Sequence, residues 1–144
     1  MVSLIDIDKP SGKKKRNQAL RMSANNRITS YADSDKNFYP TPPEATRQLL
    51  AYETFEGWIR EPACGNGAMS EVLKETGNRV VSTDLIDRGY GIGGIDFLRD
   101  EKQAPNVVTN PPFELASEFV YHGYKVAERK LALFLKLTFL EGID

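Results

Sequence analysis

The sequence predicts an α/β protein in which a mostly parallel sheet of about five strands is flanked by helices. Short apolar, β-compatible runs alternate with segments whose apolar residues recur at helical spacing. A glycine-rich turn follows one run and a proline-rich turn follows another. Candidate functional residues lie where successive apolar runs end, near residues 63, 84, 96 and 109. Parallel sheets bind ligands at the carboxyl ends of their strands, so we expect a site there.

Length and composition fit one soluble domain. The chain has 144 residues, of which 40% are hydrophobic and 27% charged, as is ordinary for a globular protein. Its single cysteine, Cys64, excludes an internal disulfide, and with one histidine in the chain no metal site is expected. No apolar run approaches the ~20 residues that span a bilayer, and no signal peptide is evident. We therefore expect a cytoplasmic protein without a membrane partner.

Charge divides the chain into a basic arm and an acidic body. Seven Lys or Arg residues and no acidic residue lie between Lys9 and Ala32, whereas 12 basic and 18 acidic residues follow from Asp33 onward. Residues 1–36 also have few apolar residues and many turn formers, which predicts a flexible, disordered arm before a folded domain over residues 37–144. The arm is either a solvated tail or a segment that docks on a partner or neutralises nucleic-acid phosphates.

The folded domain is expected to begin with a helix from about Pro43 to Glu53. The stretch TPPE places prolines and then Glu44 in the first turn, where a fixed φ and a negative charge both favour a helix. Leu49 and Leu50 follow at helical spacing.

A strand, a glycine turn and a second helix come next, in GWIREPACGNGAMSEVLKETG. Gly65 and Gly67 let a ligand approach the backbone closely because glycine has no Cβ. Ser70 stands where a nucleotide fingerprint has its third glycine, so a tight structural turn is the alternative. Asp84 ends the next strand, NRVVSTDL, 19 residues after Gly65. This spacing favours an acidic residue that binds the ribose of an adenosine-containing cofactor, although a turn aspartate is the alternative.

The remaining elements complete the alternation. The stretch GYGIGGIDFL predicts a loop and a short extended piece that ends near Asp96, beside Phe97. A carboxylate and a ring there can contact adenine, although such a pair read alone is more often structural. APNVVTNPPF predicts a fourth strand with its exit turn, ELASEFVYHGYKVAERK an amphipathic helix, and LALFLKLTFLEG a buried strand.

The exit turn TNPPFE is unusually stiff. Pro111 and Pro112 fix two φ angles and remove two N–H donors, and they push Asn110 toward extended geometry. Such a turn holds an amide and the ring of Phe113 in fixed positions at the end of a strand.

Five stretches follow one another along the chain: YPTPPE, EPACGNG, STDL, IDFL and NPPF. With these motifs in this order, the chain resembles the class I S-adenosylmethionine-dependent methyltransferases, and among them the enzymes that methylate N6 of adenine in DNA. The resemblance covers roughly residues 37–141 and implies a Rossmann-like fold and S-adenosylmethionine as cofactor. NPPF is its specific part, because a NAD enzyme has no use for this motif.

The resemblance implies a role for each motif. The Asn110 side-chain oxygen and the Pro111 carbonyl would accept hydrogen bonds from a planar amine, whose lone pair is then released toward the methyl group. Phe113 would stack on a base swung out of its duplex. The implied catalytic residues are Asn110, Pro111, Pro112 and Phe113. The implied cofactor residues are Tyr39, Thr41 and Pro42 at the methionine end, Glu61, Ala63, Gly65 and Gly67 around the amino-acid part, Asp84 at the ribose, and Asp96 with Phe97 at the adenine.

Several alternatives stay open. The motif reads a planar amine, so cytosine N4, guanine N2 in RNA or a protein glutamine could replace adenine in DNA. The family's sheet continues with a further helix and an antiparallel pair, whereas this chain ends soon after LKLTFLEGID. It is therefore expected to be C-terminally shortened, and to be completed by a partner or to act as a non-catalytic binding module. An open sheet edge would also favour self-association.

Overall fold

The structure, a computed structural model, describes residues 2–6 and 40–136. Most of the expected basic arm, Tyr39 and residues 137–144 lie outside these ranges. The elements, in chain order, are β1 (Val2–Asp6), α2 (Pro43–Tyr52), β2 (Ile59–Glu61), α3 (Ala68–Lys74), β3 (Val80–Ser82), the 3-10 helix η2 (Phe97–Arg99), β4 (Ala104–Thr109), the 3-10 helix η3 (Phe113–Leu115), α4 (Ala116–Val126) and β5 (Ala127–Phe134).

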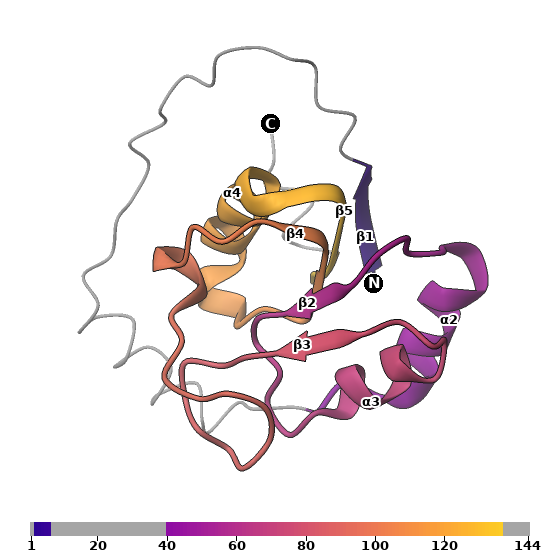
Figure 1. The fold of residues 1–144 in the computed structure, drawn as a ribbon, viewed down its shortest axis with the longest axis horizontal. Coiled ribbons are helices and arrows are strands. Elements are labelled where there is room, and N and C mark those ends of the chain that lie inside the picture. The colour runs from indigo at the N-terminus through magenta and orange to yellow at the C-terminus, as the bar shows by residue number, and fades with distance from the viewer. Residues whose placement is uncertain (1, 7–39, 137–144) are drawn as a thin grey trace.

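The strands form one five-stranded sheet in the order β1-β5-β4-β2-β3 (Figure 1). The pairs β2–β3, β2–β4 and β4–β5 are parallel, and only β1 runs antiparallel to its neighbour β5. The α/β class, the mostly parallel sheet and the flanking helices are thus confirmed. Parallel pairing brings the ends of β2, β3 and β4 to the same edge, where the site residues were expected.

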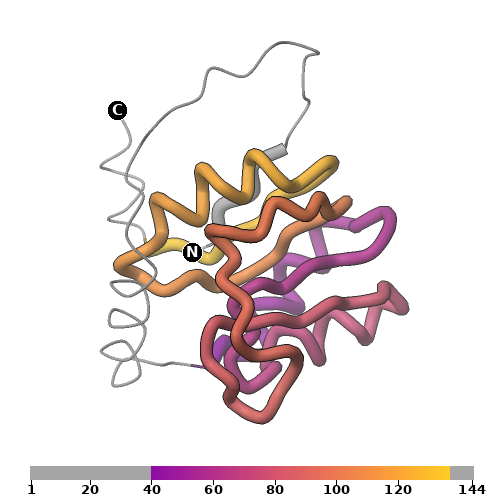
Figure 2. The backbone as a smooth tube through the Cα atoms, turned by 60° about the vertical axis from the view of Figure 1, so that its left-hand side comes forward, coloured from indigo at the N-terminus to yellow at the C-terminus, as the bar shows by residue number. Residues whose placement is uncertain are grey.

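Helices cover both faces of the sheet. Adjacent residues of a strand point to opposite faces, so neighbouring residues of β4 belong to different core clusters. Val107 belongs to the core cluster under α4, together with Phe119 of that helix. Val108 belongs to the cluster on the other face, with Leu49 of α2 and Leu73 of α3. Figure 2 shows α4, in orange and yellow, apart from the magenta segments of α2 and α3. Covering both faces leaves the strand ends free for a ligand.

The boundaries of one predicted element are close to the expected ones, whereas the start of another is displaced. Helix α2 ends at Tyr52, one residue before the predicted Glu53, which is extended and donates its N–H to the Leu49 carbonyl at 2.9 Å. Strand β5 starts at Ala127, although AERK was predicted to belong to the preceding helix. These residues pair with β4 and β1, so tertiary pairing overrides their helical preference.

The short extended piece predicted to end near Asp96 is wrong. This segment contributes one isolated bridge, between Thr83 and Ile92, and then enters η2. Gly91 and Gly94 have φ of 67° and 74°, which strand residues do not adopt. The glycines of GYGIGG form the loop that was expected, but the chain then enters η2, capped by Asp96, without forming the expected strand.

Strand β1 was missed, because its residues were assigned to the flexible arm. It pairs with β5 along its whole length, from Val2 opposite Phe134 to Asp6 opposite Lys130. The edge of β5 that was expected to be open is therefore covered. Self-association stays a prediction, and within the described ranges the edge strands of the sheet are β1 and β3.

Candidate functional site

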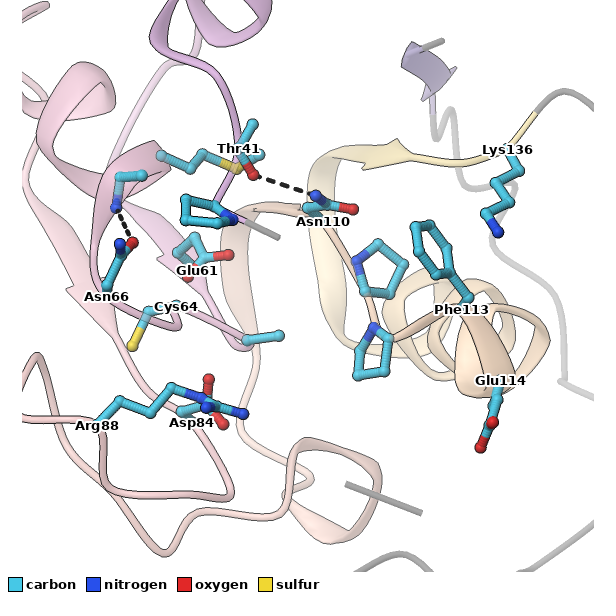
Figure 3. Close-up of a pocket in the computed structure, with 16 residues that line it drawn as sticks. Thr41, Glu61, Cys64, Asn66, Asp84, Arg88, Asn110, Phe113, Glu114 and Lys136 are labelled. Carbon is cyan, nitrogen blue, oxygen red and sulfur yellow. Dashed lines mark hydrogen bonds between the residues drawn. The ribbon is translucent and has the colours of Figure 1, made fainter. Parts of the chain in front are cut away.

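A pocket of about 470 Å³ lies at the carboxyl ends of β2, β3 and β4 (Figure 3). Its volume suits a small-molecule ligand, since such sites measure roughly 300–1,000 Å³. Eight of the predicted residues line it. Four come from the cofactor set, Thr41, Glu61, Ala63 and Asp84, and four are the whole catalytic set, Asn110, Pro111, Pro112 and Phe113.

The other predicted residues lie around this pocket or away from it. Pro42, Gly65 and Gly67 are not among its lining residues but adjoin residues that are. Phe97 is only 2% exposed and packs in the core, with its ring centroid 5.1 Å from that of Phe119. The Asp96 side chain accepts the Leu98 N–H at 3.1 Å and so caps η2. The structure gives Asp96 and Phe97 a structural role, and their contact with adenine stays a prediction.

The glycine turn and Asp84 are in direct contact, and the ribose-binding role expected from their spacing stays a prediction. The Gly65 N–H donates to Asp84 Oδ2 at 2.9 Å, and the Ile86 N–H donates to Asp84 Oδ1 at 3.0 Å. Asp84 is 4% exposed, yet each of its oxygens has a further lone pair for a ligand hydroxyl. Gly67 has φ of 87°, and a Cβ there would overlap the Tyr90 ring.

Glu61 is a buried carboxyl group that is only half satisfied. It is 1% exposed, and its Oε1 accepts the Thr109 hydroxyl at 2.6 Å. Its Oε2 has no hydrogen-bond partner within the described ranges. Burial raises the pKa of Glu61 to about 8, an effect that the Thr109 hydrogen bond opposes and the nearby Asp84 charge increases. A buried oxygen of this kind suits a ligand that brings a cation or an N–H donor.

The NPPF turn follows β4 directly and faces the same pocket. Asn110 donates from Nδ2 to Thr41 Oγ1 at 3.1 Å, and its oxygen points away from Thr41 (Figure 3). The Pro112 carbonyl is occupied, since it accepts the Leu115 N–H at 3.0 Å. Asn110 Oδ1 and the Pro111 carbonyl are then the acceptors that this turn can offer to a substrate.

Two cationic residues of the pocket were missed. Lys136 follows β5, and its ammonium lies 4.0 Å from the centroid of the Phe113 ring, which is 44% exposed. Arg88 lies in the loop after Asp84. Arg88 follows the carboxyl end of a predicted strand, which is a signal that could have identified it. Lys136 lies within the predicted strand LALFLKLTFLEG and belongs to no motif, so the sequence offered no such signal for it.

Cys64 also lines the pocket, and it is a small packing residue there. Burial raises the pKa of its thiol to about 12, so it is not a thiolate at neutral pH. In residues 2–6 and 40–136, no cluster of three His, Cys, Asp or Glu side chains is placed to hold a metal ion. Nor does any helix of these ranges have the length and apolarity needed to cross a membrane.

Comparison with known proteins defines the class of fold. No family model matches the chain. Among solved structures, it resembles magnesium protoporphyrin IX methyltransferase (ChlM) from Synechocystis PCC 6803, solved with bound SAM, with a TM-score of 0.50 and 18% identity. The match covers 85% of this chain and 64% of that one. The chain thus has the Rossmann-like α/β fold that this methyltransferase has, and it spans less than two thirds of that protein's length.

Proposed function

We propose that this protein transfers a methyl group from S-adenosylmethionine to an exocyclic amino group, with N6 of adenine in DNA as the favoured target. One observation carries the proposal: a buried carboxyl group with a free oxygen and a proline-stiffened amide line the same pocket. The two are adjacent, since Glu61 is hydrogen-bonded to Thr109, the residue before Asn110. A cofactor half and a substrate half in contact are what methyl transfer requires.

The residues of the cofactor half fit S-adenosylmethionine. Glu61 Oε2 would accept a hydrogen bond from the cofactor's ammonium group, which would supply a cationic partner that the described part of the chain does not. The free lone pairs of Asp84 would accept the ribose hydroxyls, with the glycine turn held beside them by the Gly65 N–H. When bound, the cofactor supplies an electrophilic methyl group on a sulfonium.

The residues of the substrate half fit a planar amine. Its nitrogen is a poor nucleophile because the lone pair is delocalised into the ring. Asn110 Oδ1 and the Pro111 carbonyl would accept hydrogen bonds from its two N–H groups and favour a tetrahedral nitrogen. This nitrogen would form the new N–C bond to the methyl group as the S–C bond of the cofactor breaks. The S–C electron pair would stay on the sulfur, and the nitrogen would pass one proton to solvent water. Acceptors held rigid before the reaction stabilise the developing charge without reorganisation.

A nucleic-acid base is the amine favoured by the rest of the site. Phe113 has 44% of its surface exposed, enough to stack on a flipped base. Lys136 beside it and the seven basic residues of the arm would neutralise phosphates. Cytosine N4, guanine N2 in RNA and a protein glutamine stay alternative targets, because the NPPF turn reads the amine and not the polymer.

Transfer of a radiolabelled methyl group tests the proposal. Unmethylated duplex DNA, RNA and protein are each incubated with the chain, and the DNA is digested for base analysis. We expect label in N6-methyladenine. Label in RNA or protein alone would change the substrate, and no label in any polymer would overturn the proposal.

Asn110→Ala provides the residue-level comparison in the same assay. The variant should lose transfer while it still binds S-adenosylmethionine. Gln103→Ala, which removes an exposed amide before β4, is the matched control and should retain activity. Full transfer by Asn110→Ala would remove the NPPF turn from the mechanism.

A further inference from the structure

We infer that Thr41 is a positioning residue for Asn110, and that it holds the catalytic amide with its oxygen toward the substrate. The inference rests on the proposed function and assigns Thr41 more than a place beside the cofactor. The two residues are 69 positions apart, yet Asn110 Nδ2 donates to Thr41 Oγ1 at 3.1 Å (Figure 3).

The orientation of the amide decides whether the turn can work. An asparagine side chain has almost the same shape after a half-turn of its amide, but the half-turn exchanges an acceptor for a donor. If Nδ2 faced the substrate, N–H would oppose N–H and the amine would not be held. A neighbour that accepts from Nδ2 favours the productive orientation.

Both partners are stiffened in the same way, because each directly precedes a proline. Thr41 lies between Pro40 and Pro42, and Asn110 precedes Pro111. The residue before a proline is restricted to extended geometry, so each side chain leaves a backbone with few alternatives. Thr41 is also 8% exposed, which limits competition from water for this hydrogen bond.

A hydroxyl group can donate as well as accept, so Thr41 fixes the amide only when its own proton is taken elsewhere. Under the proposed function, the carboxylate at the methionine end of the cofactor is the nearby group that can only accept. Thr41 would donate to it and keep its lone pairs for Asn110 Nδ2. An occupied cofactor site would thereby orient the catalytic amide.

The test compares Thr41→Val and Thr41→Ser in the methyl-transfer assay at saturating cofactor. Valine keeps the shape but removes the hydroxyl, and kcat should fall at least about tenfold, because about 1.4 kcal/mol of barrier is a factor of ten. Serine keeps the hydroxyl and should restore kcat to within about threefold of the wild type. If saturating cofactor restores the kcat of Thr41→Val, Thr41 only binds the cofactor and the inference is wrong.

Thr46→Val is the matched control. Thr46 lies on α2, is fully buried, and its hydroxyl has no hydrogen-bond partner in the described part of the chain. The same substitution there should leave kcat unchanged. A similar loss in Thr46→Val would mean that damage to α2, and not the contact with Asn110, lowers the rate.

A second readout uses the protein without cofactor. Unfolding midpoints are measured for Thr41→Val, Asn110→Ala and the double variant. The shifts of the two single variants should not add, because both substitutions remove the same hydrogen bond. Additive shifts would overturn the inference even if transfer were normal. If the wild type neither binds S-adenosylmethionine nor transfers methyl, the proposed function fails and this role of Thr41 fails with it.

Discussion

At the scale of single residues, Glu61 is where stability and binding conflict. Its carboxyl group is enclosed, and within residues 2–6 and 40–136 one of its oxygens lacks a partner, which is unfavourable for folding but suitable for a cationic ligand. Such conflicts are typical of functional sites, because a purely structural position would hold an apolar residue. The pKa of about 8 expresses the same conflict as a preference for the neutral form.

We predict that Glu61→Gln stabilises the protein at alkaline pH. The pKa of Glu61 is raised from 4.5 to about 8, so between these values the folded chain holds a proton that the unfolded chain has lost. The contribution of Glu61 to the free energy of unfolding therefore falls as pH rises through this window, by more than about 2 kcal/mol. Urea unfolding at pH 5 and pH 9 measures it. The difference between the variant and the wild type should be small at pH 5 and much larger at pH 9.

At the scale of elements, Gly67 in the turn between β2 and α3 can be compared with Gly77, which follows α3. Gly67 and Gly77 both have positive φ, of 87° and 85°. A Cβ at Gly67 would also overlap the Tyr90 ring, whereas a Cβ at Gly77 would have nothing within 4 Å. The two positions therefore separate backbone strain from steric overlap.

Gly67→Ala should destabilise the protein by more than Gly77→Ala, and it alone should weaken binding of S-adenosylmethionine. Backbone strain costs about 1–2 kcal/mol in each variant, and the overlap with Tyr90 adds to it only at Gly67. Chemical unfolding and calorimetry of cofactor binding check the pair. Equal losses in both variants would contradict the close contact between this turn and the loop that carries Tyr90.

Some contacts between elements could be predicted from the sequence, and others could not. The contact between Gly65 and Asp84 could be predicted, because a parallel sheet brings consecutive strand ends together. The burial of Phe97 could not, because it depends on α4, whose Phe119 covers the ring. Lys136 lies over the Phe113 ring, and no spacing in the sequence encodes that contact.

At the scale of the whole molecule, β1 closes the sheet against β5. It was unpredictable from its local sequence, because the run VSLID is short and precedes a strongly basic stretch. Its pairing is long-range, between residues more than a hundred positions apart, and local propensity carries no information on such contacts. The class of fold and the strand-end site were predictable because both follow from the alternation of strands and helices.

We predict that deletion of residues 1–7 promotes self-association. The deletion would expose the edge of β5, whose backbone groups now pair with β1 from Val2 to Asp6. An exposed edge offers unpaired N–H and C=O groups to a second chain. Sedimentation velocity at several concentrations measures the effect. A variant that sediments like the full chain at every concentration would show that β1 does not protect this edge.

The role of the arm is tested without disturbing β1. Replacing Lys13, Lys14, Lys15 and Arg16 with glutamine removes four of the arm's seven cations. Binding to duplex DNA should weaken, and the slope of log K against log salt should fall by up to about 0.9 for each lost phosphate contact. An unchanged slope would leave the arm as a solvated tail.

The central claim is that one pocket holds a cationic methyl donor on Glu61 beside the NPPF turn. Its most direct test is calorimetric titration of the full chain with S-adenosylmethionine at pH 7, in buffers of different ionisation enthalpy. We expect the wild type to bind and to release a proton, because the ligand's ammonium makes Glu61 ionise, and we expect Glu61→Gln to bind at least about tenfold more weakly without proton release. Wild-type affinity in Glu61→Gln, or no binding heat in either protein, would contradict the account.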